Sequence, residues 1–201
     1  MNVLLLGSKS ISRQKLLREA RIPFELVQQD ANEHECDWNL SLEQTTRSIA
    51  RHKMKHVLLP HGNNGDICFV LTADSLTADK YGRLHGKPLH KEDARQKFTL
   101  FNEGVRVGTA FCLERKQWIN DTWVTQQAIE QFVDAACDIQ VSDDMFEEYI
   151  HYIADYLNLS AGLDIQDFGA QFVKSITGSY TTIIGLPMYE LRLALISIGF
   201  F

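Results

Sequence analysis

The N-terminal stretch Val3-Leu4-Leu5-Leu6-Gly7-Ser8-Lys9-Ser10-Ile11-Ser12-Arg13-Gln14-Lys15-Leu16-Leu17 decides how the fold begins. An apolar run typical of a buried strand leads through a short Gly/Ser turn into the basic start of a helix. The first turn of a helix carries unpaired N–H groups and partial positive charge, which favour anions. The stretch therefore predicts a strand–turn–helix unit that can bind phosphate. An ordinary strand–helix connection would have the same pattern, since neither a Walker spacing nor G-x-G-x-x-G is present.

The composition is that of an ordinary globular protein. The 201 residues are 45% hydrophobic and 23% charged, which predicts a single domain over residues 1–201. The formal net charge of −6 argues against general nucleic-acid binding, which favours a basic surface. It permits a small polyanionic ligand, provided that cations gather locally or a metal ion supplies the charge.

The cysteines and the apolar runs indicate the compartment. Cys36, Cys68, Cys112 and Cys137 form no C-x-x-C motif, so we expect reduced thiols rather than a zinc site. The apolar run at the N-terminus is too short for a signal peptide, and no run approaches the roughly 20 residues that span a bilayer. We expect a cytoplasmic protein that does not associate with membranes.

Helical and strand patterns alternate along the chain, which favours an α/β fold with a mixed, twisted central sheet and flanking helices. The apolar run 67–73 is typical of a strand buried on both faces. The predicted strands cover 2–6, 23–28, 67–73, 104–115, 121–134 and 171–176, with a small hairpin over 76–84. The predicted helices cover 11–20, 41–59, 90–102, 143–156 and a segment after Pro187, and 158–170 is irregular.

Asp74 is the acid with the most informative position. It follows the apolar run 67–73, and ligands of open α/β sheets lie beyond the carboxyl ends of strands. A carboxylate there can hold a divalent cation or activate a water molecule. A turn-capping aspartate would look the same. Gly86-Lys87-Pro88 follows closely and predicts a lysine held in place by a stiff loop.

Two polar loops supply further candidates. Glu33 and Glu35 lie in the loop 30–37 with His34 between them, where solvated surface acids are the simplest interpretation. The glycine-punctuated stretch 160–170 contains Gln166, which could contact a base edge or place a water molecule. Long irregular loops inside compact domains are often functional.

Taken in order, these segments resemble the Maf, or septum-formation, nucleoside triphosphate pyrophosphatases. The resemblance covers nearly the whole chain. Its parts are Ser8-Lys9-Ser10-Ile11-Ser12-Arg13-Gln14-Lys15-Leu16-Leu17, Glu33, Lys53, Ala73-Asp74-Ser75, Gly86-Lys87-Pro88, Ala161-Gly162, Ile165-Gln166, Gly169-Ala170, Ile176-Thr177-Gly178-Ser179-Tyr180 and Ile184-Gly185-Leu186-Pro187. Each motif alone is weak, but their order and spacing together are specific.

The resemblance implies a two-lobed architecture around a cleft. It also implies an enzyme that hydrolyses a standard or modified nucleoside triphosphate to the monophosphate and pyrophosphate. Asp74, Glu33 and Lys87 would be catalytic, and Asp74 with Glu33 would hold Mg²⁺, Mn²⁺ or Co²⁺. The substrate-binding residues would be Ser8, Ser10, Arg13, Lys53 and Gln166. The resemblance also implies a homodimer.

Several positions depart from the family pattern. Ile11 and Ser12 replace a proline and an arginine, and Ser160 replaces a lysine in a loop that is one residue shorter. Thr109-Ala110-Phe111 replaces Thr-Gly-Val. A missing phosphate-binding cation costs on the order of 1.5–3 kcal/mol. These departures leave an alternative open, in which the chain is a catalytically weak Maf-like paralogue that binds nucleotides and acts through a partner.

Overall fold

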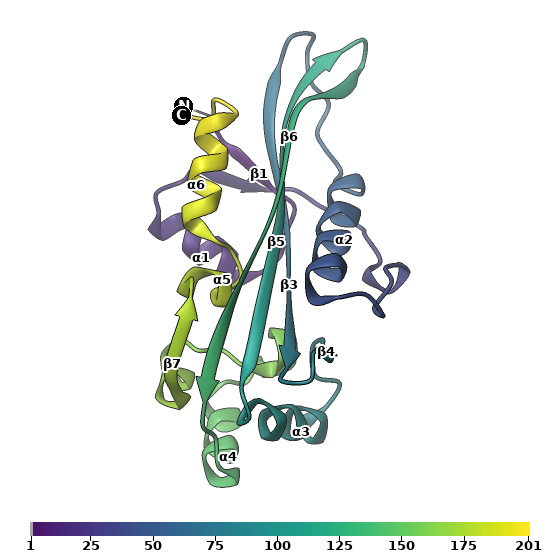
Figure 1. Cartoon of the computed structure of the whole chain (residues 1–201). Helices are drawn as coiled ribbons and strands as arrows, with labels where there is room; N and C mark the ends of the chain where they lie inside the picture. Colours follow the sequence, from purple (N-terminus) through teal and green to yellow (C-terminus); the bar gives the residue numbers. More distant parts are fainter. Residues whose placement is uncertain (1) are drawn as a thin grey trace.

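A seven-stranded mixed sheet runs through the computed structural model, which describes residues 2–201 (Figure 1). The strand order is β2-β1-β3-β5-β6-β7, with β4 paired to β3. The strands are β1 (Leu4–Leu6), β2 (Phe24–Leu26), β3 (Ile67–Asp79), β4 (Leu84–His85), β5 (Val105–Ile119), β6 (Thr122–Ile139) and β7 (Val173–Gly178). Among the strand pairs of residues 2–201, β1–β2 and β1–β3 are the only parallel ones. The predicted α/β class with a mixed sheet is confirmed.

Helices cover both faces of the sheet (Figure 1). They are α1 (Ile11–Glu19), α2 (Leu42–Lys55), α3 (Lys91–Phe101), α4 (Asp143–Tyr152), α5 (Tyr180–Ile184) and α6 (Met188–Ser197). Helices α1 and α6 share an apolar core with β1, β3 and β5, whereas α2 packs Ala50 and Met54 on the opposite face. A second apolar core joins α3, α4 and the end of β6. Short 3-10 helices complete the chain at η1 (Glu33–Glu35), η2 (Tyr156–Asn158), η3 (Ser160–Gly162) and η4 (Asp167–Phe172).

The path of β3 corrects a prediction that matters for the site. The strand continues to Asp79 instead of ending at residue 73, because β5 pairs with it at every position from Ile67 to Asp79. Asp74 therefore lies inside a strand. The other edge of β3 pairs with β1 up to Leu71 and with β4 from Thr77. In the described part of the chain, no strand pairs with that edge between these two positions, so it is open beside Asp74.

Other boundaries differ for local reasons. The turn between β5 and β6 lies at Asn120-Asp121, not near residues 116–117, because these two residues adopt the positive φ angles (49° and 60°) of a two-residue hairpin turn. The predicted junction is instead a register shift between Arg115 and Lys116. Helix α2 ends at Lys55 and α4 at Tyr152, earlier than predicted, and β7 begins two residues later.

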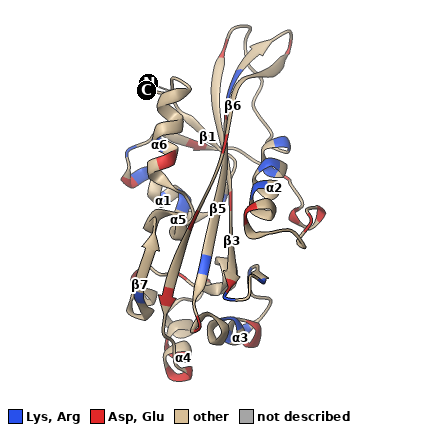
Figure 2. Ribbon diagram, in the orientation of Figure 1, with Lys and Arg blue, Asp and Glu red and all other residues tan. Residues whose placement is uncertain are grey.

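Figure 2 shows Lys and Arg (blue) and Asp and Glu (red) scattered over many elements of the ribbon. Within residues 2–201, no helix has the length and hydrophobicity needed to cross a membrane. Cys36, Cys68, Cys112 and Cys137 are all free thiols, as the sequence predicts.

Candidate active site

The open edge of β3 is where the predicted site residues gather. The turn after β1 approaches it closely, since a Cβ on Gly7 would lie 2.9 Å from Val57 Cγ2 and 3.0 Å from Thr72 Cγ2. The Gly7 N–H donates to the Leu71 carbonyl (2.9 Å) and fixes the turn. Helix α1 then begins at the N-cap Ser10, whose hydroxyl accepts from the Arg13 N–H (3.4 Å). Ser10 is thus a helix cap, and ligand binding remains a prediction for it.

Lys53 joins the two predicted metal-binding carboxylates. It lies at the end of the buried face of α2, a helix that starts with a capping box between Ser41 and Gln44. Its Nζ is 2.6 Å from Asp74 Oδ1 and 2.8 Å from Glu33 Oε1. The Lys53 and Asp74 side chains are only 9% and 8% exposed, whereas Glu33 is 44% exposed at the start of η1. The three residues predicted from motifs far apart in sequence form one ion-pair cluster.

The two carboxyl groups have different proton affinities. Burial raises the pKa of Asp74 above its ordinary value, and the charges of Lys53 and Arg13 offset this only in part. Burial also opposes ionisation of Glu33, but Lys53, Lys87 and Arg13 outweigh it and lower the Glu33 pKa. When their environments shift the pKa values of two neighbouring carboxyl groups in opposite directions, the group with the raised pKa suits a base and the group with the lowered pKa stays ionised.

Asp74 has one unused oxygen. Its Oδ2 is buried and has no hydrogen-bond partner among residues 2–201. An orphaned buried carboxylate oxygen is costly unless a ligand binds it. Together with Glu33 it suits a hard cation such as Mg²⁺, which usually takes one or two protein carboxylates and completes its shell with water and substrate phosphates. The donors present therefore fit the predicted divalent cation, although no group of three or more His, Cys, Asp or Glu able to hold a metal occurs in the described chain.

Arg13 and Ser8 approach from the other side of the open edge. The buried Arg13 side chain donates from Nη1 to Ser8 Oγ (3.0 Å), from Nη2 to Ser75 Oγ (3.0 Å) and from Nε to the Gly185 carbonyl (2.8 Å). Burial lowers the pKa of Arg13 from its ordinary value, while Asp74 and Glu33 act in the opposite direction. Ser75 and Gly185 lie inside the quoted motifs, yet their contacts with Arg13 could not be predicted.

Lys87 and Gln166 lie at the margin. Lys87 is exposed after β4, and its charge is near enough to lower the pKa of Glu33. Its backbone carbonyl accepts from Lys97 Nζ (3.2 Å), which also pairs with Asp93 (2.8 Å). Gln166 Oε1 accepts from Lys15 Nζ (3.2 Å), a contact outside the Lys53 cluster.

The late loop is anchored to the same edge of β3. Ser160 Oγ lies 3.3 Å from Thr77 Oγ1 and 3.4 Å from the Ser75 carbonyl. Tyr149, which is fully buried, donates to the Gly162 carbonyl (3.0 Å) and accepts from the Asp164 N–H (2.7 Å). Tyr149 was missed in the sequence because its role depends on a loop folded against α4.

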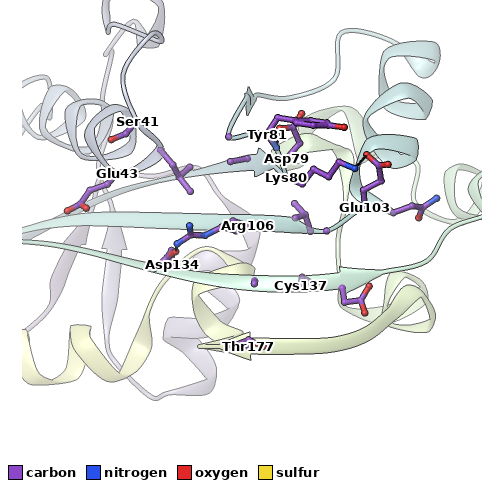
Figure 3. A pocket seen from close by; sticks show the side chains of 18 of the residues that line it. Ser41, Glu43, Asp79, Lys80, Tyr81, Glu103, Arg106, Asp134, Cys137 and Thr177 are labelled. Carbon is purple, nitrogen blue, oxygen red and sulfur yellow. Dashed lines mark hydrogen bonds and ion pairs between the residues drawn. The ribbon is translucent and has the colours of Figure 1, made fainter.

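A separate hollow of about 1130 Å³ lies between the start of α2 and the end of β3 (Figure 3). None of the predicted site residues lines it. Its charged side chains are already paired, Lys80 with Glu103 at 2.8 Å and Arg106 with Asp134. The ion-pair cluster of Glu33, Lys53 and Asp74 thus lies outside this hollow.

Comparison with known proteins decides the family. The model of the family described as Maf-like protein matches residues 3–198. The chain belongs to the Maf-like family. Relatives include a dTTP/UTP pyrophosphatase of Acholeplasma laidlawii (31% identity, 92% of this chain and 91% of that protein) and one of Hydrogenovibrio crunogenus (31%, 94% and 92%). A dTTP/UTP pyrophosphatase of Alkaliphilus oremlandii is 28% identical over 97% of this chain and 95% of its own length. The Maf resemblance read from the motifs is confirmed.

Proposed function

We propose that this Maf-like protein is a nucleoside triphosphate pyrophosphatase that acts on dTTP and UTP. The observation that carries the proposal is the free, buried Asp74 Oδ2 beside Lys53 in a member of this family. The relatives named above are dTTP/UTP pyrophosphatases that align over almost their whole length, which supports the pyrimidine choice.

The residues suggest a division of labour. A triphosphate carries about four negative charges, and Arg13, Lys53 and Lys87 would bind its oxygens. Asp74 Oδ2 would accept a proton from a water molecule as the water oxygen forms a bond to phosphorus. The anhydride bond between the α and β phosphates then breaks, and pyrophosphate leaves. Glu33, which stays ionised, would hold Lys53 in place and share with Asp74 a divalent cation that neutralises phosphate charge.

A pyrophosphate-release screen tests the proposal. The full chain is incubated with dTTP, UTP, dCTP, dATP, GTP and modified triphosphates, each with Mg²⁺, Mn²⁺ or Co²⁺ and each with a chelator. We expect turnover of dTTP and UTP that requires the cation. Nucleotide binding by calorimetry without pyrophosphate release from any substrate would contradict the proposal and favour the alternative, a nucleotide-binding relative that acts through a partner. Ser12 and Ser160, which replace basic family residues, are the features that favour that alternative.

Two further expectations belong to the proposal. The four free cysteines are consistent with a reducing cytoplasm, where we propose that the protein acts. We also propose a homodimer on the basis of the family resemblance. Light scattering coupled to size-exclusion chromatography would give twice the 23.0 kDa chain mass, and a monomer mass would contradict it.

A further inference from the structure

A chain of hydroxyl groups fixes the Arg13 guanidinium. Of its five N–H groups, one on each nitrogen is engaged, by the Gly185 carbonyl, Ser8 Oγ and Ser75 Oγ. One N–H on Nη1 and one on Nη2 remain without a partner in the described residues. Two such groups on a planar guanidinium form the fork that binds a phosphate by two hydrogen bonds.

The direction of the hydroxyl chain follows from its end. Ser75 Oγ is 2.7 Å from Thr109 Oγ1, and Thr109 Oγ1 is 2.8 Å from the Thr182 carbonyl. A carbonyl only accepts, so the single Thr109 hydroxyl hydrogen points to Thr182. The Ser75 hydrogen must then point to Thr109, which leaves a Ser75 lone pair facing Arg13 Nη2. A competing contact from Ser75 Oγ to the Gly185 carbonyl is much longer, at 3.5 Å.

This series of hydrogen-bonded hydroxyl groups connects three elements. Ser75 and Thr109 are direct cross-strand partners of β3 and β5, and Thr182 lies in α5. Thr109 is fully buried and has no exposed surface with which to contact substrate. A valine would fill nearly the same space, so the hydroxyl is the distinctive feature of this position. A buried hydroxyl is costly unless it is hydrogen-bonded, as it is here.

We propose that Thr109 is a positioning residue, whose hydroxyl orients Ser75 so that Arg13 presents its two free N–H groups to a substrate phosphate. The proposal rests on the proposed function for its substrate. Without the Thr109 hydroxyl, the Ser75 hydrogen can turn toward the Gly185 carbonyl or toward the ligand. The acceptor that fixes Nη2 is then lost, and the fork turns away from the phosphate. Misplacing a charge-assisted contact of this kind costs roughly ten- to hundredfold in kcat/KM.

The first test compares three variants of the full chain. Thr109→Val removes the hydroxyl, Thr109→Ser keeps it, and Thr46→Val is the matched control. Thr46 is also fully buried and donates to a carbonyl, that of Leu42 in α2 (2.6 Å), but has no contact with Arg13. With dTTP and Mg²⁺ we expect roughly a ten- to hundredfold loss of kcat/KM for Thr109→Val alone. Thr109→Ser should remain close to wild type, and the two valine variants should melt at similar temperatures. Wild-type kinetic constants for Thr109→Val would overturn the proposal.

The second test uses free guanidinium as the probe. Arg13→Ala leaves an empty slot formed by Ser8 Oγ, Ser75 Oγ and the Gly185 carbonyl. Millimolar guanidinium chloride should restore part of the activity of Arg13→Ala, with equal sodium chloride as the control. It should restore much less in Arg13→Ala/Thr109→Val, because the slot has lost its oriented acceptor. Equal restoration in both variants would overturn the positioning role.

Failure of the proposed function gives a different result. If the wild-type chain releases no pyrophosphate from any nucleotide, the proposed function fails. The affinity of dTTP, measured by calorimetry for wild type, Thr109→Val and Thr109→Ser, then decides the inference. A selective loss in Thr109→Val supports it, and equal affinities overturn it.

Discussion

Lys53 Nζ lies 2.6 Å from Asp74 Oδ1, and both side chains are almost completely buried. The pair neutralises one Asp74 oxygen and leaves the other, Oδ2, buried without a partner among residues 2–201. Removing one member of a buried pair usually destabilises a protein, because the other charge is left uncompensated. The retained free oxygen is better explained by chemistry than by stability.

We expect Asp74→Asn to abolish pyrophosphate release while the protein remains folded. The amide keeps the shape of the side chain and can still accept from Lys53, but it cannot take a proton from water and is a poorer metal ligand. The measurements are pyrophosphate release with dTTP and thermal unfolding by circular dichroism. Retained dTTP binding by calorimetry would show that the site is intact. Turnover near that of wild type would remove Asp74 from the mechanism.

The acid limb of the pH profile should respond oppositely to two substitutions. Asp74 must be ionised to act as a base, so activity falls as the pH drops through its pKa, which burial raises. Glu33 contributes to raising that pKa and Lys53 lowers it. Glu33→Gln should therefore move the acid limb of kcat/KM to lower pH, and Lys53→Met should move it to higher pH. Profiles measured between about pH 4 and 9 with saturating Mg²⁺ check this. Limbs that shift in the same direction, or not at all, would show that another group controls the profile.

Lys87→Ala should weaken the binding of dTTP more than that of dTMP. Lys87 is exposed beyond β4 and is close enough to lower the pKa of Glu33, so its ammonium can reach phosphates at that cluster. The β and γ phosphates carry most of the charge, and the monophosphate lacks them. Calorimetric titrations with both nucleotides measure the two losses. Lys91→Ala, which removes an exposed lysine from α3, is the matched control. Equal losses for dTTP and dTMP would mean that Lys87 does not contact the polyphosphate.

The sequence predicted what is local and missed what depends on distant pairing. The strand–turn–helix unit at residues 3–17 was identified correctly because its apolar run, glycine turn and Ser10 cap are contiguous. The length of β3 was wrong because it depends on β5, some thirty residues later. Arg13 was a candidate from its motif, but its acceptors Ser75 and Gly185 are 62 and 172 residues away. No local pattern reports such contacts.

Asp79→Asn should lower the free energy of unfolding by roughly 2 kcal/mol near neutral pH. The buried Asp79 carboxylate accepts from the N–H groups of Tyr81 (2.9 Å) and Arg83 (3.0 Å), from Arg83 Nε (2.7 Å) and from His85 (3.2 Å). Burial alone would raise the pKa of Asp79, but the N–H of Arg83, His85 and the other donors outweigh it and lower the pKa to about 2. The folded state therefore favours the ionised form. Its stabilisation is complete above the ordinary pKa of about 4 and is lost as the pH falls toward 2.

Urea denaturation at pH 7 and pH 3 measures this. The difference in the free energy of unfolding between wild type and Asp79→Asn should be smaller at pH 3 than at pH 7. Asp121→Asn is the control, because Asp121 is exposed at the hairpin tip with a φ of 60° that asparagine also adopts. A difference that stays constant between the two pH values would show that the charge of Asp79 is not what stabilises this turn.

Ser12→Arg should strengthen dTTP binding, because the motif resemblance implies a cation at this position. Ser12 is the second residue of α1, half-buried and next to Arg13, so a long side chain there can extend toward the same phosphates. A cation at a helix N-terminus opposes the helix dipole, which costs a few tenths of a kcal/mol, whereas a phosphate contact contributes about 1.5–3 kcal/mol. The gain from the phosphate contact should therefore exceed the cost at the helix dipole. The value of kcat/KM should rise if the contact also stabilises the transition state. The gain in binding should shrink as the salt concentration rises, since an exposed charge pair is screened over about 8–10 Å.

Ser197→Arg adds the same charge to the exposed face of α6 and should leave the kinetics unchanged. Steady-state kinetics at two salt concentrations compares the variants. No gain for Ser12→Arg at low salt would mean that the late loop, anchored through Ser160 to β3, has reshaped the phosphate site, and the nucleotide-binding alternative would then be the better explanation.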